Sequence, residues 1–247
     1  MPITFTCSID DGHPLDLRTA ELLKKHNLNA TFYIPIKNRE GESVMTPLQI
    51  RTLAEQFEIG SHTYDHCFLN SVGIAEARFQ IHEGKKILED LLGSAVSGFC
   101  YPGGKYRREH ANLVRGAGFG YARTTMNLCF DAGENRFEIP TTCQFYPHER
   151  SVFLRNFVRS GQWPRRKAGL KISLRQQPWI DRLYALFDLA QSRGQVFHLW
   201  AHSIDIDRWN AWQELDFFLA YVASEVSPRN RLDNQQLAAR FFRAGNS

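Results

Sequence analysis

The sequence lacks the features that mark disulfide-rich, zinc-ribbon and membrane-spanning proteins. Its 247 residues contain five cysteines, an odd number with no CxxC spacing, so neither a disulfide framework nor a thiolate zinc site is predicted. Apolar runs are short, and the run at residues 217–223 is far below the roughly 20 residues that cross a bilayer. The chain does not open with a basic segment followed by an apolar stretch. We therefore expect a soluble, cytoplasmic protein with reduced thiols.

An excess of charge of one sign is also missing, except in one segment. The formal net charge is only +4, yet residues 150–175 contain eight basic residues and no acidic one. These residues are Arg150, Arg155, Arg159, Arg165, Arg166, Lys167, Lys171 and Arg175. The rest of the chain is net acidic and carries no recognition motif, so nucleic acid is not an expected partner. The basic segment either forms a solvated helix and loop or docks onto anionic groups.

Strand-like and helix-like patterns alternate along the chain. The strand-like runs are residues 3–9, 30–34, 57–60, 96–101, 119–123 and 195–200. The helix-like stretches are residues 15–26, 47–56, 74–92, 107–117, 178–193 and 209–226. The alternation predicts an α/β fold, in which helices surround a mostly parallel sheet that closes as a barrel or nearly so. We expect one domain over residues 1–247, with an irregular basic insertion at about 125–177, where the alternation stops.

Polar motifs follow four of the predicted strands. They are Asp10-Asp11-Gly12, residues 60–66 (GSHTYDH), residues 99–104 (FCYPGG) and residues 200–203 (WAHS). In an α/β barrel the carboxyl ends of the strands form one rim, where active sites are built, so we expect the motifs to lie together. Taken singly, each has an ordinary interpretation: an Asp-Gly turn, an incidental histidine pair or a β-turn.

The histidines of these motifs have the spacing of a metal site. His62 and His66 are four residues apart, so on a helical turn both imidazoles face the same way and reach one cation. Two histidines and a carboxylate bind a divalent cation and leave positions open for water. Strand alternation places His198 and His202 on one face. We expect His198 to be an interior histidine, whereas His202 lies past the strand end, where it can meet substrate.

Taken in order, the four motifs resemble those of the polysaccharide deacetylase family, the NodB-homology proteins of carbohydrate esterase family 4. The resemblance covers residues 1–125 and 195–203. It implies a distorted (β/α) barrel of the NodB type with a divalent metal on its carboxyl-end rim. It also implies that Asp11, His62 and His66 are the ligands. Zinc is the first expectation for the metal, and the same ligands accept cobalt, nickel or iron.

The resemblance further implies the roles of the remaining site residues. Asp10 would be the general base, His202 the general acid, and the backbone N–H of Gly103 a donor to the oxyanion. The residues expected beside the substrate are Tyr101, Trp200 and Arg123. Trp200 stands where the family usually has a leucine that lines the acetyl-methyl pocket, so we expect a small acyl group.

The sequence departs from the family pattern at two places. Cys100 stands where most relatives have an arginine that pairs with the base aspartate. Its candidate replacements are Arg123, Lys105 and Arg107. The aspartate that orients the acid histidine in the family is not recognisable either, and Asp205 and Asp207 are the local candidates.

The expected function is metal-dependent N-deacetylation of sugar units in a surface-polysaccharide or O-antigen precursor. Two alternatives are a non-sugar amide hydrolase on the same scaffold and a catalytically silent carbohydrate-binding barrel. Without an export signal, the enzyme would meet its N-acetylated glycan or sugar precursor on the cytoplasmic side. The basic residues 150–175 would then bring it to phosphate groups or to the surface of the inner membrane.

Overall fold

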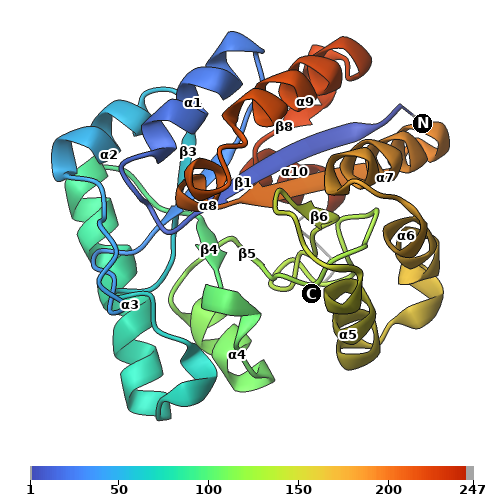
Figure 1. The fold of residues 1–247 in the computed structure, drawn as a ribbon. Helices are drawn as coiled ribbons and strands as arrows, with labels where there is room; N and C mark the ends of the chain where they lie inside the picture. Colours follow the sequence, from blue (N-terminus) through green and yellow to red (C-terminus); the bar gives the residue numbers. More distant parts are fainter. Residues whose placement is uncertain (1, 243–247) are drawn as a thin grey trace.

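The computed structural model describes residues 2–242 and shows one curled, all-parallel sheet with helices around it (Figure 1). The strands are β1 (Thr4–Asp10), β2 (Thr31–Ile34), β3 (Glu58–Ser61), β4 (Gly98–Cys100), β5 (Tyr121–Arg123), β6 (Cys143–Gln144), β7 (Val196–Ala201) and β8 (Arg231–Leu232). Their order is β5-β4-β3-β2-β1-β7-β6, and β8 pairs with the start of β1. Within the described range β5 and β6 do not pair, so the barrel is open there. The predicted distorted α/β barrel is confirmed.

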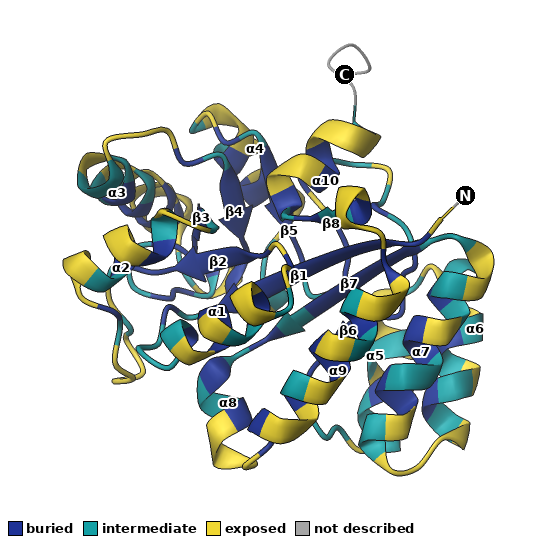
Figure 2. Cartoon of the chain, turned by 90° about the horizontal axis from the view of Figure 1, so that it is seen from above, coloured by how far each residue is buried: buried dark blue, intermediate teal, exposed yellow. Residues whose placement is uncertain are grey.

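Helices connect the strands and cover the outside of the sheet. They are α1 (Asp16–Lys25), α2 (Pro47–Ala54), α3 (Ile74–Leu92), α4 (Arg108–Gly116), α5 (Arg150–Ser160), α6 (Trp163–Arg175), α7 (Trp179–Arg193), α8 (Ser203–Arg208), α9 (Trp212–Glu225) and α10 (Asn234–Phe241). Figure 2 shows that the strands are buried along their length, whereas most helices expose one side. The stretch predicted as one helix over residues 209–226 begins at Trp212, and the short helix α8 precedes it.

Local sequence signals account for several helix ends. The Thr46 side chain accepts a hydrogen bond from the backbone N–H of Gln49 while the Gln49 side chain accepts from the N–H of Thr46, and Pro47 occupies the first position of α2. Helix α3 ends at Gly93, whose φ of 67° lies in the left-handed region that favours glycine. These signals fix where each helix begins or ends before any long-range packing is considered.

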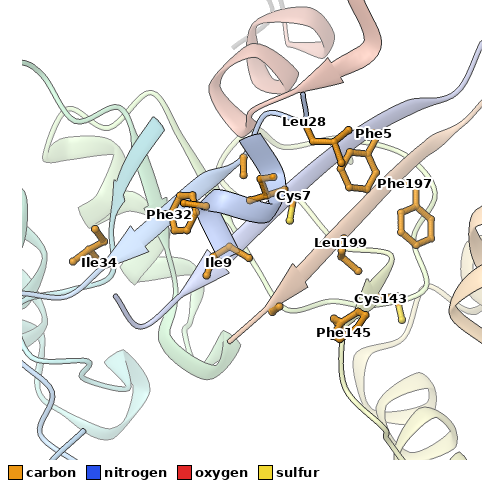
Figure 3. Packing of buried hydrophobic residues seen from close by; sticks show 14 of the residues in the cluster. Phe5, Cys7, Ile9, Leu28, Phe32, Ile34, Cys143, Phe145, Phe197 and Leu199 are labelled. Atoms are coloured by element: carbon orange, nitrogen blue, oxygen red, sulfur yellow. The ribbon is translucent and has the colours of Figure 1, made fainter. Parts of the chain in front are cut away.

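The central strand β1 has an apolar face that packs against the helices. Phe5, Cys7 and Ile9 point to this face, and in register with them Phe197 and Leu199 extend it along β7 (Figure 3). Alternation along the strand puts every second residue of β1 on the same side. The apolar half of β1 therefore anchors the sheet to its outer layer of helices.

The other face of β1 is polar and points into the barrel. Thr6 and Ser8 bond to Asn234 at the start of α10, and Ser8 Oγ lies 2.6 Å from Nε2 of His198. His198 is 1% exposed, as expected of an interior histidine. The same alternation brings Asp10, the last residue of β1, to the inner side at the carboxyl-end rim.

The region that includes the basic segment is more ordered than its sequence suggested. Residues 125–177 were expected as an irregular insertion, but they contain the helices α5 and α6 and the short strand β6. Arg166 is fully buried, and it donates to backbone carbonyls of Asn127, Asn156 and Gly161. Asn127 lies 39 residues before Arg166 in the chain, so the burial of Arg166 could not be deduced from local pattern.

The helices in residues 2–242 include none that is both long and apolar enough to cross a membrane.

Candidate active site

The ends of three strands bring the predicted site residues to one rim. Asp10 closes β1 and Asp11 follows it, His62 directly follows β3, and His202 directly follows β7. Because β1, β3 and β7 are parallel members of one sheet, their carboxyl ends open on the same side. The structure therefore places these side chains together, as the order of the motifs predicted.

Asp11, His62 and His66 face one another. Asp11 Oδ1 lies 3.4 Å from His62 Nε2 and 3.2 Å from His66 Nε2. One ligand atom from each of the three residues falls within 4.8 Å of the others. The two imidazole rings are 5.1 Å apart, centroid to centroid.

The backbone around these residues differs from the helical turn that we expected. Thr63 and His66 have φ values of 69° and 62°, and Asp11 has 78°. Left-handed backbone at residues other than glycine is uncommon and gathers at functional sites. The two histidines thus meet through a strained turn and not through the i,i+4 geometry of a helix.

The polar groups of this triad fit a divalent cation. Nδ1 of His62 lies 2.9 Å from the carbonyl oxygen of Cys100, which can only accept, so Nδ1 carries the proton and Nε2 turns its lone pair towards Asp11. Asp11 Oδ1 and His66 Nδ1 are buried and make no hydrogen bond to the described residues. A lone pair and a carboxylate that face each other require a cation or a proton between them. Two imidazoles and one carboxylate suit zinc and its neighbours.

Electrostatics keep Asp11 ionised. Burial on its own would raise the pKa of this carboxyl, but interactions with His62 and His66 lower the pKa well below its usual range. An ionised, oriented carboxylate is the form that binds a metal ion.

Asp10 is held by an arginine from the other side of the site. It is 2% exposed, and Oδ1 accepts a hydrogen bond from Nη2 of Arg123 at the end of β5. The Sγ atom of Cys100 is 3.9 Å from Oδ2. Of the three candidate replacements for the missing arginine, Arg123 is the one that pairs with Asp10. Arg107 instead lies 3.6 Å from Glu109.

Arg123 and Tyr101, which we expected beside the substrate, are both 0% exposed. The rings of Tyr33 and Trp200 cover the guanidinium at 5.2 and 5.3 Å. The hydroxyl of Tyr101 donates to the backbone carbonyl of Phe137. Arg123 therefore pairs with Asp10, and Tyr101 supports the loop that contains Phe137.

His202 is oriented by Asp205. Its Nδ1 lies 2.9 Å from Asp205 Oδ2, and its Nε2 points into the site, 3.7 Å from Asp11 Oδ2. Asp207 does not compete, because it accepts from the indole N–H of Trp212. Burial alone would lower the pKa of His202, but the bond to Asp205 and the charges of Asp11 and Asp10 raise it to about 9.

A cavity of about 410 Å³ lies next to Trp200, whose ring packs against His202. Gly103 and Trp200 line it, and so do Gln144 and His148 from the segment after β5. The Trp200 ring stands perpendicular to the His202 ring at 5.2 Å. Gly103 has a φ of 58°, so a glycine is required where the backbone borders the cavity.

Some residues at the rim escaped sequence analysis. Asp16 in α1 is fully buried, and burial raises its pKa well above the usual value. Gln144 Nε2 lies 3.5 Å from His202 Nδ1, and its Oε1 accepts from His148. The only sequence signal at Gln144 was its position in the segment that breaks the βα alternation.

Comparison with known proteins finds relatives among polysaccharide deacetylases. Residues 3–122 match the sequence model of a protein family described as polysaccharide deacetylase. The peptidoglycan-N-acetylglucosamine deacetylase of Bacillus cereus is 36% identical over 91 residues, which are 36% of this chain and 32% of that protein. The chitooligosaccharide deacetylase of Azorhizobium caulinodans is 31% identical over 115 residues, or 45% of this chain and 53% of that protein. The matched part thus spans about a third to a half of these curated relatives.

Solved structures resemble nearly the whole chain in fold. The Puue allantoinase superimposes with a TM-score of 0.68 at 16% identity, covering 98% of this chain and 91% of that one. A probable polysaccharide deacetylase from Pseudomonas aeruginosa PAO1 gives a TM-score of 0.67 at 17% identity, with the same coverage of 98% and 91%. At these identities the likeness establishes the fold alone.

Proposed function

Because residues 3–122 belong to the polysaccharide deacetylase family, we propose that the chain is a metal-dependent N-deacetylase of N-acetylated sugar units. Its substrate would be a surface-polysaccharide or O-antigen precursor met in the cytoplasm, and residues 1–247 would form one deacetylase domain. The observation that carries the proposal is the meeting of Asp11, His62 and His66 at one point of the rim, with Asp10 and His202 on either side.

Asp11, His62 and His66 would hold the divalent cation, for which zinc is the first expectation. When bound, such a cation polarises the acetyl carbonyl and lowers the pKa of water. The chain contributes the ionised carboxylate of Asp11 and the fixed tautomer of His62, whose Nδ1 proton is held by the carbonyl of Cys100.

Asp10 would act as the general base through Oδ2. Arg123 occupies Oδ1, so Oδ2, which has only the weak Cys100 thiol donor 3.9 Å away among the described residues, would accept a proton from the attacking water. The buried guanidinium stabilises the ionised carboxylate, and the rings of Tyr33 and Trp200 hold the guanidinium in place. This pairing speaks against a catalytically silent barrel, the alternative that the missing arginine had encouraged.

His202 would act as the general acid through Nε2. Asp205 holds Nδ1–H, so the second proton of the imidazolium lies on Nε2, which faces the site. A pKa of about 9 keeps His202 protonated at neutral pH, where it can donate to the departing amine. The backbone N–H of Gly103 would donate to the oxyanion, and Trp200 would form the wall beside a small acetyl group.

The exposed face of α5 and α6 would make a peripheral contact with an anionic membrane. Leu154, Val158 and Trp163 are 48%, 60% and 55% exposed, and Arg155 and Lys167 are exposed among them. Apolar side chains beside basic ones suit the interface of anionic lipids, where each basic residue contributes about 1 kcal/mol.

Vesicle co-sedimentation tests this contact. Changing both Arg155 and Lys167 to glutamate should abolish binding to phosphatidylglycerol vesicles, whereas Arg193→Glu on α7 should leave it unchanged. Arg165 and Arg166 are unsuitable for such a test, because Arg165 pairs with Asp131 and Arg166 is buried. Equal binding by the double variant and the wild type would refute the contact.

Acetate release tests the activity itself. The protein should release acetate from N-acetylglucosamine oligomers or N-acetylated sugar precursors, and Asp10→Asn should stop it. Hydrolysis of ureides or other non-sugar amides, with no action on any N-acetylated sugar, would establish the amide-hydrolase alternative instead.

A further inference from the structure

The cavity beside His202 has an unusual charge composition. Lys105 and Arg159 both line it, and none of the described residues around it is acidic. Neither cation makes an ion pair within 4.0 Å in residues 2–242. They come from distant parts of the chain, one from the loop after β4 and the other from α5. Two uncompensated cations thus face one hollow of about 410 Å³.

The neutral side chains of the cavity offer donors. Oδ1 of Asn127 accepts a 2.7 Å hydrogen bond from the buried Arg166, so the amide N–H groups of Asn127 remain available. Oε1 of Gln144 is likewise occupied by His148. The indole N–H of Trp200 is buried and has no acceptor among the described residues. For Asn127 and Gln144 the side-chain acceptor is used within the protein, and the indole N–H of Trp200 is left for a ligand.

Such a cavity complements an anion with several acceptor oxygens. Lysine, arginine and N–H donors are the groups that bind phosphate in proteins, and charge-assisted hydrogen bonds are the strong ones. The volume lies within the range of small-ligand sites and leaves room for more than one phosphate group.

The position of the cavity indicates where the anion is attached. Trp200, on its wall, lies 5.2 Å from the His202 ring, and Gly103, the proposed donor to the oxyanion, also lines it. The cavity therefore adjoins the reacting amide and the sugar that bears it. In a 2-acetamido sugar, the anomeric carbon is one of the two ring carbons next to the one that bears the nitrogen. A phosphate there would be close enough to enter the cavity.

We propose that this cavity is an anion subsite for a phosphate or diphosphate carried on the anomeric carbon of the sugar that is deacetylated. The proposal rests on the proposed deacetylase function for the placement of the sugar. It names the substrate class as a 2-acetamido sugar 1-phosphate ester. A nucleotide diphosphate sugar and a polyprenyl diphosphate sugar share this chemistry.

Product binding tests the subsite separately from activity. Glucosamine 1-phosphate cannot be deacetylated, so its affinity, measured by calorimetry against that of glucosamine, reports the phosphate contact alone. The phosphate should tighten binding at least tenfold. Arg159→Gln and Lys105→Gln should each remove most of this advantage, because each deletes a charge-assisted hydrogen bond. Arg155→Gln, the same change on the same helix but outside the cavity, should retain it.

Steady-state kinetics extend the test to substrates. The wild type should have a higher kcat/KM for UDP-N-acetylglucosamine or for a short-chain polyprenyl diphosphate N-acetylglucosamine than for neutral chitobiose. The variants Arg159→Gln and Lys105→Gln should lose this preference while their activity on chitobiose persists. Preference for either phosphorylated substrate supports the subsite. The substrate with the higher kcat/KM identifies whether the phosphate comes from a nucleotide or from a polyprenyl lipid.

The outcomes separate the subsite from the activity. Equal affinity of the wild type for glucosamine and its 1-phosphate, or an equal loss in Arg155→Gln and Arg159→Gln, would overturn the subsite even if acetate is released. Phosphate-dependent binding without acetate release from any N-acetylated sugar would instead overturn the deacetylase function and leave the anion site standing.

Discussion

A buried hydrogen-bond network inside the barrel and the carboxyl-end rim differ in whether their polar groups have partners. In the network that runs from Glu58 through Tyr121, Tyr33 and Asn234 to His198, every buried side-chain polar atom of the described residues has a hydrogen-bond partner. At the carboxyl-end rim, Asp11 Oδ1, His66 Nδ1, two nitrogens of Arg123 and the indole N–H of Trp200 have none.

The difference separates structural from functional polarity. A buried polar group without a partner costs about 1–3 kcal/mol, so several such groups gathered at one place are expected where a ligand satisfies them. The satisfied network stabilises the barrel, whereas the unsatisfied rim is arranged for a ligand. Substitutions at the rim should therefore change catalysis, and substitutions in the network should change stability.

Asp10→Asn should have the largest effect on activity. It removes the base while the amide keeps nearly the same shape, so kcat for acetate release should fall about 10³-fold. The metal content should stay close to that of the wild type, because Asp10 is not among the proposed ligands, whereas the melting temperature should fall, because the buried Arg123 loses its charged partner. A variant that retains more than a tenth of the wild-type kcat would show that another group accepts the proton.

Arg123→Gln should affect both catalysis and stability, since the buried ion pair of Arg123 joins the rim to the interior. Removing one partner leaves the charge of Asp10 buried and unpaired, which costs about 3–5 kcal/mol in the free energy of unfolding. Denaturant unfolding measures this loss. The double variant Asp10→Asn/Arg123→Gln should recover part of the stability, and strict additivity of the two single losses would contradict the pairing.

Glu58→Gln should change stability without changing the chemistry. Burial, followed by the charge of Asp233, raises the pKa of Glu58 to about 7 in the folded protein from a usual value of 4.5. The unfolded chain releases this proton first, so the free energy of unfolding should fall as the pH rises from about 4.5 to about 7. The loss should be on the order of 3 kcal/mol.

The glutamine variant should lack this pH dependence. Melting curves of both proteins between pH 4 and pH 8 would show it, and kcat at pH 7 should be equal in the two. Parallel pH profiles of wild type and Glu58→Gln would mean that Glu58 does not titrate in this window.

Asp205→Asn should have the smallest effect of the four. Without the carboxylate the pKa of His202 falls from about 9, so the alkaline limb of the kcat profile should move to lower pH. The value of kcat at pH 8 should fall about tenfold. Asp207→Asn, two residues along the same helix, is the matched control and should leave the limb in place. If the alkaline limb of the kcat profile does not move in Asp205→Asn, another group orients His202.

The sequence was sufficient for the features that depend on local pattern. The order of the motifs put Asp10, Asp11, His62 and His202 at the carboxyl ends of parallel strands. The bounds of α3 followed from its amphipathic pattern and from Gly93. Parallel strands all open to one side, so little long-range information was needed to expect a common rim.

The features that were missed depend on contacts between distant segments. The Asp10–Arg123 pair joins residues 113 positions apart, and only packing shows that Arg123, and not Lys105 or Arg107, reaches the base. Arg166 in α6 is buried among backbone carbonyls of other segments. The run of basic residues did not indicate this contact, and it was expected to be irregular. The histidine pair was expected on a helix, but positive φ values at Thr63 and His66 give it another geometry.

Metal analysis coupled to acetate release tests the central claim most directly. The purified protein should bind close to one equivalent of a divalent metal per chain, lose acetate release on chelation, and regain it when the metal is restored. His66→Gln should lower the metal content, and Asp207→Asn should not. Acetate release that persists undiminished in a protein shown to be free of metal would contradict the claim that Asp11, His62 and His66 form the metal site of a deacetylase.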